Sequence, residues 1–229
     1  RVVAEFESSA ALSPRTHADE TASDNAPEAP ANDTQEATSI WSAPLRKRTL
    51  ALCTVWFCIN LSYYGAFIWI PSLLSAQGFS LVKSFAFTLI MTLAQLPGYA
   101  VAAYLIERWG RRATLAVFLA GSAGAAVCYG LSHSDFYIIL SGCFLSFFNL
   151  GAWGALYAIS PEVFPTRLRG TGTGTAAGLG RIASILAPLI VPPLISFGGT
   201  GVLFAVFAAA FLLAAITTFA LPEKRGKSL

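Results

Sequence analysis

The sequence predicts an all-α membrane protein with six transmembrane helices, and two observations support this. Of its 229 residues, 55% are hydrophobic and only 12% are charged, which lies well outside the composition of soluble domains. Six apolar runs are also long enough to cross a ~30 Å hydrocarbon layer, which takes ~20 helical residues. These runs cover residues 49–74, 84–106, 113–131, 136–159, 171–196 and 199–221.

Composition divides the chain into three segments. Residues 1–45 are acidic and rich in Ala, Ser, Thr and Pro without any apolar period, so we expect a disordered tail. Residues 46–222 hold the six-helix bundle, and residues 223–229 form a short C-terminal tail. Because the chain begins with Arg1 and no signal peptide stands near its start, we expect it to be part of a longer protein.

Basic residues gather on one side of the predicted bundle, whereas the other side has Lys83 alone. The first group consists of Arg46, Lys47, Arg48, Arg108, Arg111, Arg112, Arg167, Arg169, Lys224, Arg225 and Lys227. The positive-inside rule therefore places both ends of this segment in the cytoplasm, with the bundle in a plasma membrane or bacterial inner membrane. Because these bases lie at membrane edges, we expect no nucleic-acid partner.

The sequence gives little indication of a metal site or of an enzyme. The four cysteines fall inside apolar runs without Cys-x-x-Cys or Cys/His ligand spacing, which favours core packing over a metal site. We expect neither a metal nor a cofactor.

An intramembrane serine protease would need a Gly-x-Ser-Gly turn and a histidine within a span, and the sequence has neither. We therefore do not expect an enzyme.

The first two spans contain polar side chains at membrane depth. Asn60 and Tyr64 share a helix face at i, i+4, with Tyr63 beside them. Their partners must be neighbouring helices, water or a substrate, and we favour a cavity-facing role for Asn60 and one of the tyrosines. In the second span, Gln95 lies next to a helix break at Pro97. It either satisfies backbone carbonyls freed by the proline or binds a ligand, and both roles stay open.

The fourth span carries a mixed polar and aromatic stripe. Its members follow at helical spacing: Gly142, Ser146, Asn149, Trp153 and Tyr157. Such a stripe faces protein or a water-filled cleft and not lipid. It could form a helix–helix seam held by Asn149, or it could line a cavity, and we favour the cavity.

The fifth span combines small residues with one arginine. Two rows repeat every four positions, Gly170, Gly174 and Gly178 in one and Gly172, Ala176 and Gly180 in the other. At ~1.5 Å per residue, Arg181 lies ~16 Å beyond Gly170, near the middle of the membrane. No Asp or Glu occurs inside any span. The counter-ion must therefore be a missing part of the protein, carbonyls freed near Pro188 and the following proline pair, or an anionic substrate. Since arginine pairs with both oxygens of a carboxylate, we favour the substrate.

Two charged turns resemble signatures of the major facilitator superfamily. ERWGRR, from Glu107 to Arg112, resembles the D/E-R-x-G-R-R signature. PEVFPTRLRG resembles the E-x-x-P-x-x-x-R turn of the sugar-porter branch at Glu162, Pro165 and Arg169. Both turns lie where helices 7 to 12 of a twelve-helix transporter would place them. Over SYYGAFIWIPSLL and GLGRIASILAP, the chain is similar to niacin and aromatic-acid proton symporters and to synaptic-vesicle-protein-like relatives.

This resemblance implies one half of a secondary transporter, built from two inverted three-helix repeats and working by alternating access. Its partners would be the lipid bilayer, a small-molecule substrate, protons and the missing N-terminal six-helix half. We expect substrate contacts from Asn60, Tyr63, Tyr64, Gln95, Asn149, Trp153, Tyr157 and Arg181. The resemblance implies a cytoplasmic charge network of Glu107, Arg108, Gly110, Arg111, Arg112, Glu162, Pro165, Arg167 and Arg169.

The chain also departs from the family patterns at two places. Ala103 and Glu107 stand where the signature usually has glycine and aspartate, which implies looser packing at that turn. The glutamines that sugar porters carry in helix 7 are missing from the first span, so a carboxylate such as nicotinate is favoured over a hexose. A sugar transporter, or a non-transporting sensor or scaffold on the same fold, remains the alternative.

Overall fold

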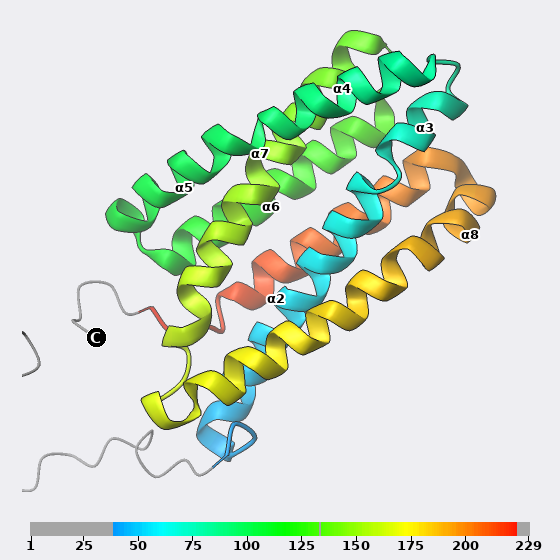
Figure 1. The fold of residues 1–229 in the computed structure, drawn as a ribbon. Coiled ribbons are helices and arrows are strands. Elements are labelled where there is room, and N and C mark those ends of the chain that lie inside the picture. The colour runs from blue at the N-terminus through cyan, green and yellow to red at the C-terminus, as the bar shows by residue number, and fades with distance from the viewer. Residues whose placement is uncertain (1–38, 133, 224–229) are drawn as a thin grey trace, which may run out of the picture. The chain divides into compact units, whose positions relative to one another are not determined.

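The computed structural model describes residues 39–132 and 134–223, and these residues are helical with no strand among them. The elements, labelled in Figure 1, are α2 (Ala43–Phe67), α3 (Ile70–Ala76), α4 (Leu81–Leu93), α5 (Gln95–Trp109), α6 (Arg111–Leu131), α7 (Asp135–Ile159), the 3₁₀ turns η1 (Ser160–Glu162) and η2 (Thr166–Leu168), and α8 (Arg169–Thr218). The first 38 residues of the expected acidic tail and the last six residues of the C-terminal tail lie outside the described residues.

Five helical stretches in the described part of the chain are long and apolar enough to cross a membrane. The last of them is interrupted at Gly198 and Gly199, where α8 doubles back (Figure 1). Gly199 has φ 68°, in the left-handed region that favours glycine. The two arms of α8 correspond to the predicted fifth and sixth spans. The predicted all-α membrane fold is confirmed.

Prolines fix the breaks in the first two predicted spans. Residues 49–74 divide into α2 and α3, and Pro71 lies in the first turn of α3, where its missing N–H needs no helical partner. Residues 84–106 divide into α4 and α5 at Ala94, close to Pro97, whose ring disfavours a continuous helix. Both spans are therefore pairs of helical segments with a bend between them.

Helix packing is concentrated in a few pairs. α2 packs most extensively against α8, while α7 packs against α5 and α6, and α6 also packs against α8. Glycines permit the closest approaches. Gly98 of α5 lies directly against the backbone of Phe147 in α7, and a Cβ at Gly180 of α8 would lie 2.6 Å from Asn60 Nδ2 of α2. A larger side chain at either glycine would force the helices apart.

The two small-residue rows of α8 have different surroundings. The row of Gly172, Ala176 and Gly180 is buried against α2 and the η1–η2 turn. The row of Gly170, Gly174 and Gly178 is exposed, and a Cβ at any of the three would meet nothing within 4 Å in the described chain. Only the first row therefore brings helices together within this bundle.

Candidate functional site

Arg181 lies on the first arm of α8 with an exposed side chain. Its Nη1 donates a hydrogen bond of 3.3 Å to the hydroxyl of Tyr64 on α2. The acidic residues of the described ranges are Glu107, Asp135 and Glu162, at helix ends, and Glu223, after the end of α8. None of these four forms a salt bridge with Arg181. The partner of the Arg181 guanidinium in the described chain is therefore the neutral Tyr64 hydroxyl and not a carboxylate.

Five aromatic side chains, which we call the aromatic cluster, join α2 to α7. Tyr63 lies between Tyr64 and Trp153, with ring centroids 5.3 and 5.9 Å apart. Trp153 stacks on Tyr157 at 5.5 Å and an interplanar angle of 27°. Trp56 completes the cluster, edge-on to both of these α7 rings at 5.7 and 5.2 Å. Trp56 and Trp153 are buried within the cluster, whereas Tyr157 is exposed and Tyr63 and Tyr64 are half-buried.

Asn60 lies in the seam between α2 and α8. Its side chain is only 1% exposed. Nδ2 donates to the Trp56 carbonyl at 2.7 Å, and Oδ1 accepts from the Ser184 hydroxyl of α8 at 2.8 Å. This placement differs from the cavity-facing role that we expected from the sequence, because Gly180 lets α8 come close enough to enclose the amide. Asn60 therefore links α2 to α8. It lies about one helical turn before Tyr64, which accepts the hydrogen bond from Arg181.

The α7 stripe is buried from Gly142 to Trp153 and exposed at Tyr157, and its buried polar side chains lack hydrogen bonds. Ser146 and Asn149 are fully buried, and the Ser146 hydroxyl, both amide atoms of Asn149 and the Trp153 Nε1 have no hydrogen-bond partner among the described residues. Gln95 of α5 is 8% exposed and lies next to Tyr63. Because buried polar groups normally bind protein or ordered water, α7 has unused hydrogen-bonding capacity beside the aromatic cluster.

Two ion pairs hold the charged turns at one end of the bundle. Arg111 Nε, at the start of α6, lies 2.9 Å from Glu162 Oε1 in η1, and the two side chains are 31% and 10% exposed. Arg112 Nε lies 3.7 Å from Glu223 Oε2, and its Nη1 donates to the Leu221 carbonyl at 3.3 Å. The start of α6 is therefore fastened both to the end of α7 and to the segment after α8.

Gly110 connects α5 to α6 with a φ of 91°. A Cβ at this position would lie 2.7 Å from Glu223 Oε1, so both backbone conformation and space favour glycine. Among the remaining members of the expected charge network, Glu107, Arg108 and Arg167 are exposed, while Pro165 and Arg169 are half-buried.

Three residues that form the contacts described above were not among the site residues predicted from the sequence. Trp56 lies four residues before Asn60, and Ser184 lies three residues after Arg181, so helical spacing from the selected residues would have found both. Glu223 has no comparable signal, because it follows the last span and belongs to neither charged motif.

Comparison with known proteins decides the family. Residues 4–229 match the family model described as sugar (and other) transporter. The chain belongs to this family of the major facilitator superfamily. A member from Bacillus subtilis, provisionally named niacin/nicotinamide transporter NiaP, is 49% identical over 180 residues, which cover 77% of this chain and 44% of the relative.

Two further members have similar coverage. The niacin transporter NiaP of Acinetobacter baylyi is 46% identical over 192 residues, covering 83% of this chain and 44% of that protein. The synaptic vesicle 2-related protein of Bos taurus is 27% identical over 215 residues, covering 83% and 38%. The chain therefore spans less than half of the length of these relatives. The match confirms the predicted resemblance to the major facilitator superfamily, and the relatives named here are transporters and not enzymes.

Proposed function

We propose that this chain is the C-terminal half of a secondary transporter that carries a small organic carboxylate, foremost nicotinate, by alternating access. The niacin transporters among its relatives support this substrate. The observation that carries the proposal is Arg181, an exposed guanidinium on an apolar helix with no salt bridge to any described carboxylate. A cation at such a depth is costly unless it is paired, so its retention favours a functional anion.

Arg181 and the aromatic cluster offer complementary halves of a nicotinate site. The guanidinium would pair with both carboxylate oxygens. The Tyr64 hydroxyl, which accepts a hydrogen bond from Arg181, would fix the orientation of the planar guanidinium group. The accessible rings of Tyr63 and Tyr157 would then pack against the pyridine ring, supported from behind by the buried ring of Trp153. Asn60 and Ser184 would act as positioning residues, because their hydrogen bond links the two helices that carry Tyr64 and Arg181.

Alternating access would come from rocking this half against an N-terminal half, with α2–α6 and α7–α8 as the two inverted repeats. The Arg111–Glu162 and Arg112–Glu223 pairs would keep the cytoplasmic turns rigid. Arg169, which is half-buried and forms no salt bridge in the described chain, would pair with the N-terminal half through the exposed part of its guanidinium. Because no Asp or Glu lies inside the spans, a carboxylate that carries the coupled proton would also belong to that half.

Uptake by proteoliposomes that hold the full-length protein tests this proposal. We expect uptake of labelled nicotinate that rises with an inward proton gradient, and loss of uptake in Arg181→Lys with normal membrane insertion. The matched control is Arg46→Lys, at an exposed position in the first turn of α2. Unchanged uptake in Arg181→Lys would remove Arg181 from the site. Uptake of glucose without nicotinate would favour a sugar transporter, and no uptake of nicotinate, benzoate or glucose by folded protein would favour a non-transporting relative.

A further inference from the structure

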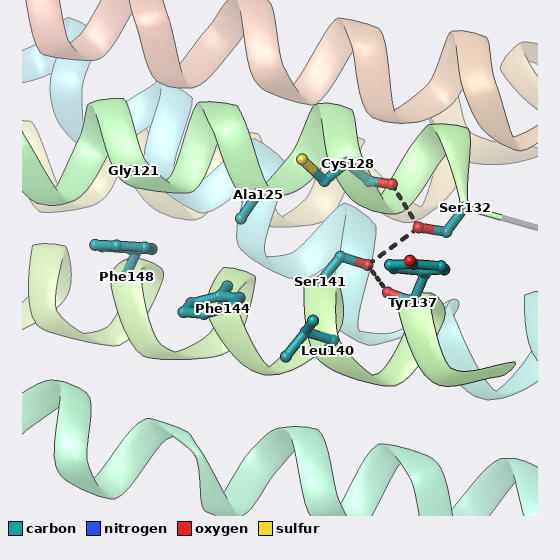
Figure 2. A pocket seen from close by; sticks show the side chains of 9 residues that line it. All are labelled: Gly121, Ala125, Cys128, Ser132, Tyr137, Leu140, Ser141, Phe144 and Phe148. Carbon is teal, nitrogen blue, oxygen red and sulfur yellow. Dashed lines mark hydrogen bonds between the residues drawn. The ribbon is translucent and has the colours of Figure 1, made fainter. Parts of the chain in front are cut away.

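A groove lies between α6 and α7, and none of its lining residues belongs to the aromatic cluster. Its volume is about 290 Å³. Ala125 and Cys128 of α6 form one wall, and Leu140, Phe144 and Phe148 of α7 form the other (Figure 2). The volume is close to the lower limit of ~300 Å³ for small-molecule pockets. The groove thus has room for one slender apolar group and not for a bulky ligand.

The groove opens on a face that is apolar and exposed. Phe144 is 50% exposed and Leu140 is 40% exposed, and the neighbouring α6 residues Val117 and Val127 are exposed too. An exposed apolar face along a spanning helix contacts either lipid or another transmembrane segment, and we assign this face to lipid. The occupant should therefore come from the bilayer.

Polar groups gather at one end of the groove only. The Ser132 hydroxyl donates to the Cys128 carbonyl at 2.6 Å, and the Ser141 hydroxyl donates to the Tyr137 carbonyl at 2.6 Å, with the two hydroxyl oxygens 3.4 Å apart (Figure 2). The phenol of Tyr137 is 61% exposed at this end. Because these residues lie where α6 ends and α7 begins, the polar end falls at the membrane interface, where tyrosine phenols are favoured.

The length of the groove matches one leaflet. At a helical rise of ~1.5 Å per residue, Tyr137 and Phe148 lie roughly 16 Å apart along α7. Half of a ~30 Å hydrocarbon layer is about 15 Å. A ligand that is polar at the interface and apolar down to the bilayer centre therefore fits the groove along its whole length.

We propose that this groove binds one acyl chain of a glycerophospholipid, with the ester carbonyl at the Tyr137 hydroxyl and the chain running past Leu140 and Phe144 to Phe148. The lipid fills the space between α6 and α7 and fixes their separation. Lipid binding here is independent of the proposed substrate and depends only on the position of α6 and α7 in the bilayer.

Photo-crosslinking tests the proposal on the full-length protein in nanodiscs of phosphatidylcholine with a diazirine in the acyl chain. We expect labelled peptides, identified by mass spectrometry, to be concentrated in the parts of α6 and α7 that line the groove. Cys128→Phe places a ring in the groove and should abolish this labelling. Val127→Phe is the matched control, because it adds the same ring at the adjacent exposed position, which does not line the groove.

Two results would overturn the proposal. One is labelling spread evenly over exposed helices, including the second arm of α8 at Leu212 and Ile216. The other is equal labelling of α6 and α7 in the two phenylalanine variants. Leu140→Trp provides a second obstruction from the α7 wall, so that a folding defect in Cys128→Phe would not leave the question open. Retained groove labelling in a folded Leu140→Trp protein would also refute the proposal.

Discussion

Replacing Gly180 with alanine should weaken the seam between α2 and α8. The added methyl would lie 2.6 Å from Asn60 Nδ2 and 3.2 Å from Trp56 Cε3, both on buried side chains that have no free space. Contacts this short require α2 to move away or Asn60 to rotate. Either change would lengthen the hydrogen bond from Ser184 to Asn60 Oδ1, now 2.8 Å.

The expected cost follows from three opposing effects. Overpacking of a tight site costs about 1–3 kcal/mol, and a weakened buried hydrogen bond adds about 1 kcal/mol. The better helix propensity of alanine returns up to ~1 kcal/mol. We therefore expect a net destabilisation of roughly 1–3 kcal/mol for Gly180→Ala. The control is Gly124→Ala in α6, where a Cβ meets nothing within 4 Å, and it should be neutral or slightly stabilising.

Thermal unfolding of the purified full-length protein in detergent measures this difference. A change of 1 kcal/mol shifts Tm by about 2–4 °C for a domain of 150–250 residues, so Gly180→Ala should unfold several degrees below Gly124→Ala. Truncating Asn60 to alanine makes room for the new methyl, so the double variant should lose less than the sum of the two single changes. Equal Tm values for the two glycine variants would show that the seam is not tight at this point.

Two further contacts lead to comparable predictions. Arg111→Gln and Glu162→Gln should each lower the unfolding free energy by about 1–3 kcal/mol, since each leaves a charge of limited exposure without its partner. The double variant should cost less than the sum of the two single variants. Strictly additive losses in denaturant unfolding would contradict the pairing. Trp56→Phe and Ser160→Ala both remove the hydrogen bond of 3.0 Å from the indole Nε1 to the serine hydroxyl, so each should cost about 0.5–1.5 kcal/mol and the two together little more than one alone. A fully additive loss in the same assay would show that ring packing, not this bond, sets the cost.

The order of the membrane spans along the chain could be predicted because membrane thickness sets the length of an apolar run. The ends of these runs were less certain. α2 begins at Ala43, before the predicted start at residue 49, and α4 begins at Leu81, before residue 84. Charged residues, Arg46 to Arg48, extend α2 beyond its apolar core, whereas α4 begins after its N-cap Ser80, whose hydroxyl accepts from the Lys83 N–H.

The buried face of each helix could be predicted only in part. The rows containing Gly174 and Ala176 have the same four-residue spacing, and only the second meets α2, because contacts far apart in the sequence make the choice. The same is true of Asn60, whose amide is enclosed by α8. The substrate-contacting residues were therefore predicted only from polar side chains within the membrane spans. Such a position shows that a side chain needs a hydrogen-bond partner, but it does not show which group is that partner.

The central claim is that Arg181 recognises a carboxylate, and a comparison of nicotinate with nicotinamide tests it most directly. The two ligands share a ring and differ in charge, and a charge-assisted hydrogen bond contributes about 1.5–3 kcal/mol, which corresponds to roughly 10–150-fold in affinity. Isothermal titration of the full-length protein should show that nicotinate binds more tightly than nicotinamide by such a factor, and that Arg181→Gln removes most of the difference. An equal preference for nicotinate in the wild type and Arg181→Gln would contradict the account.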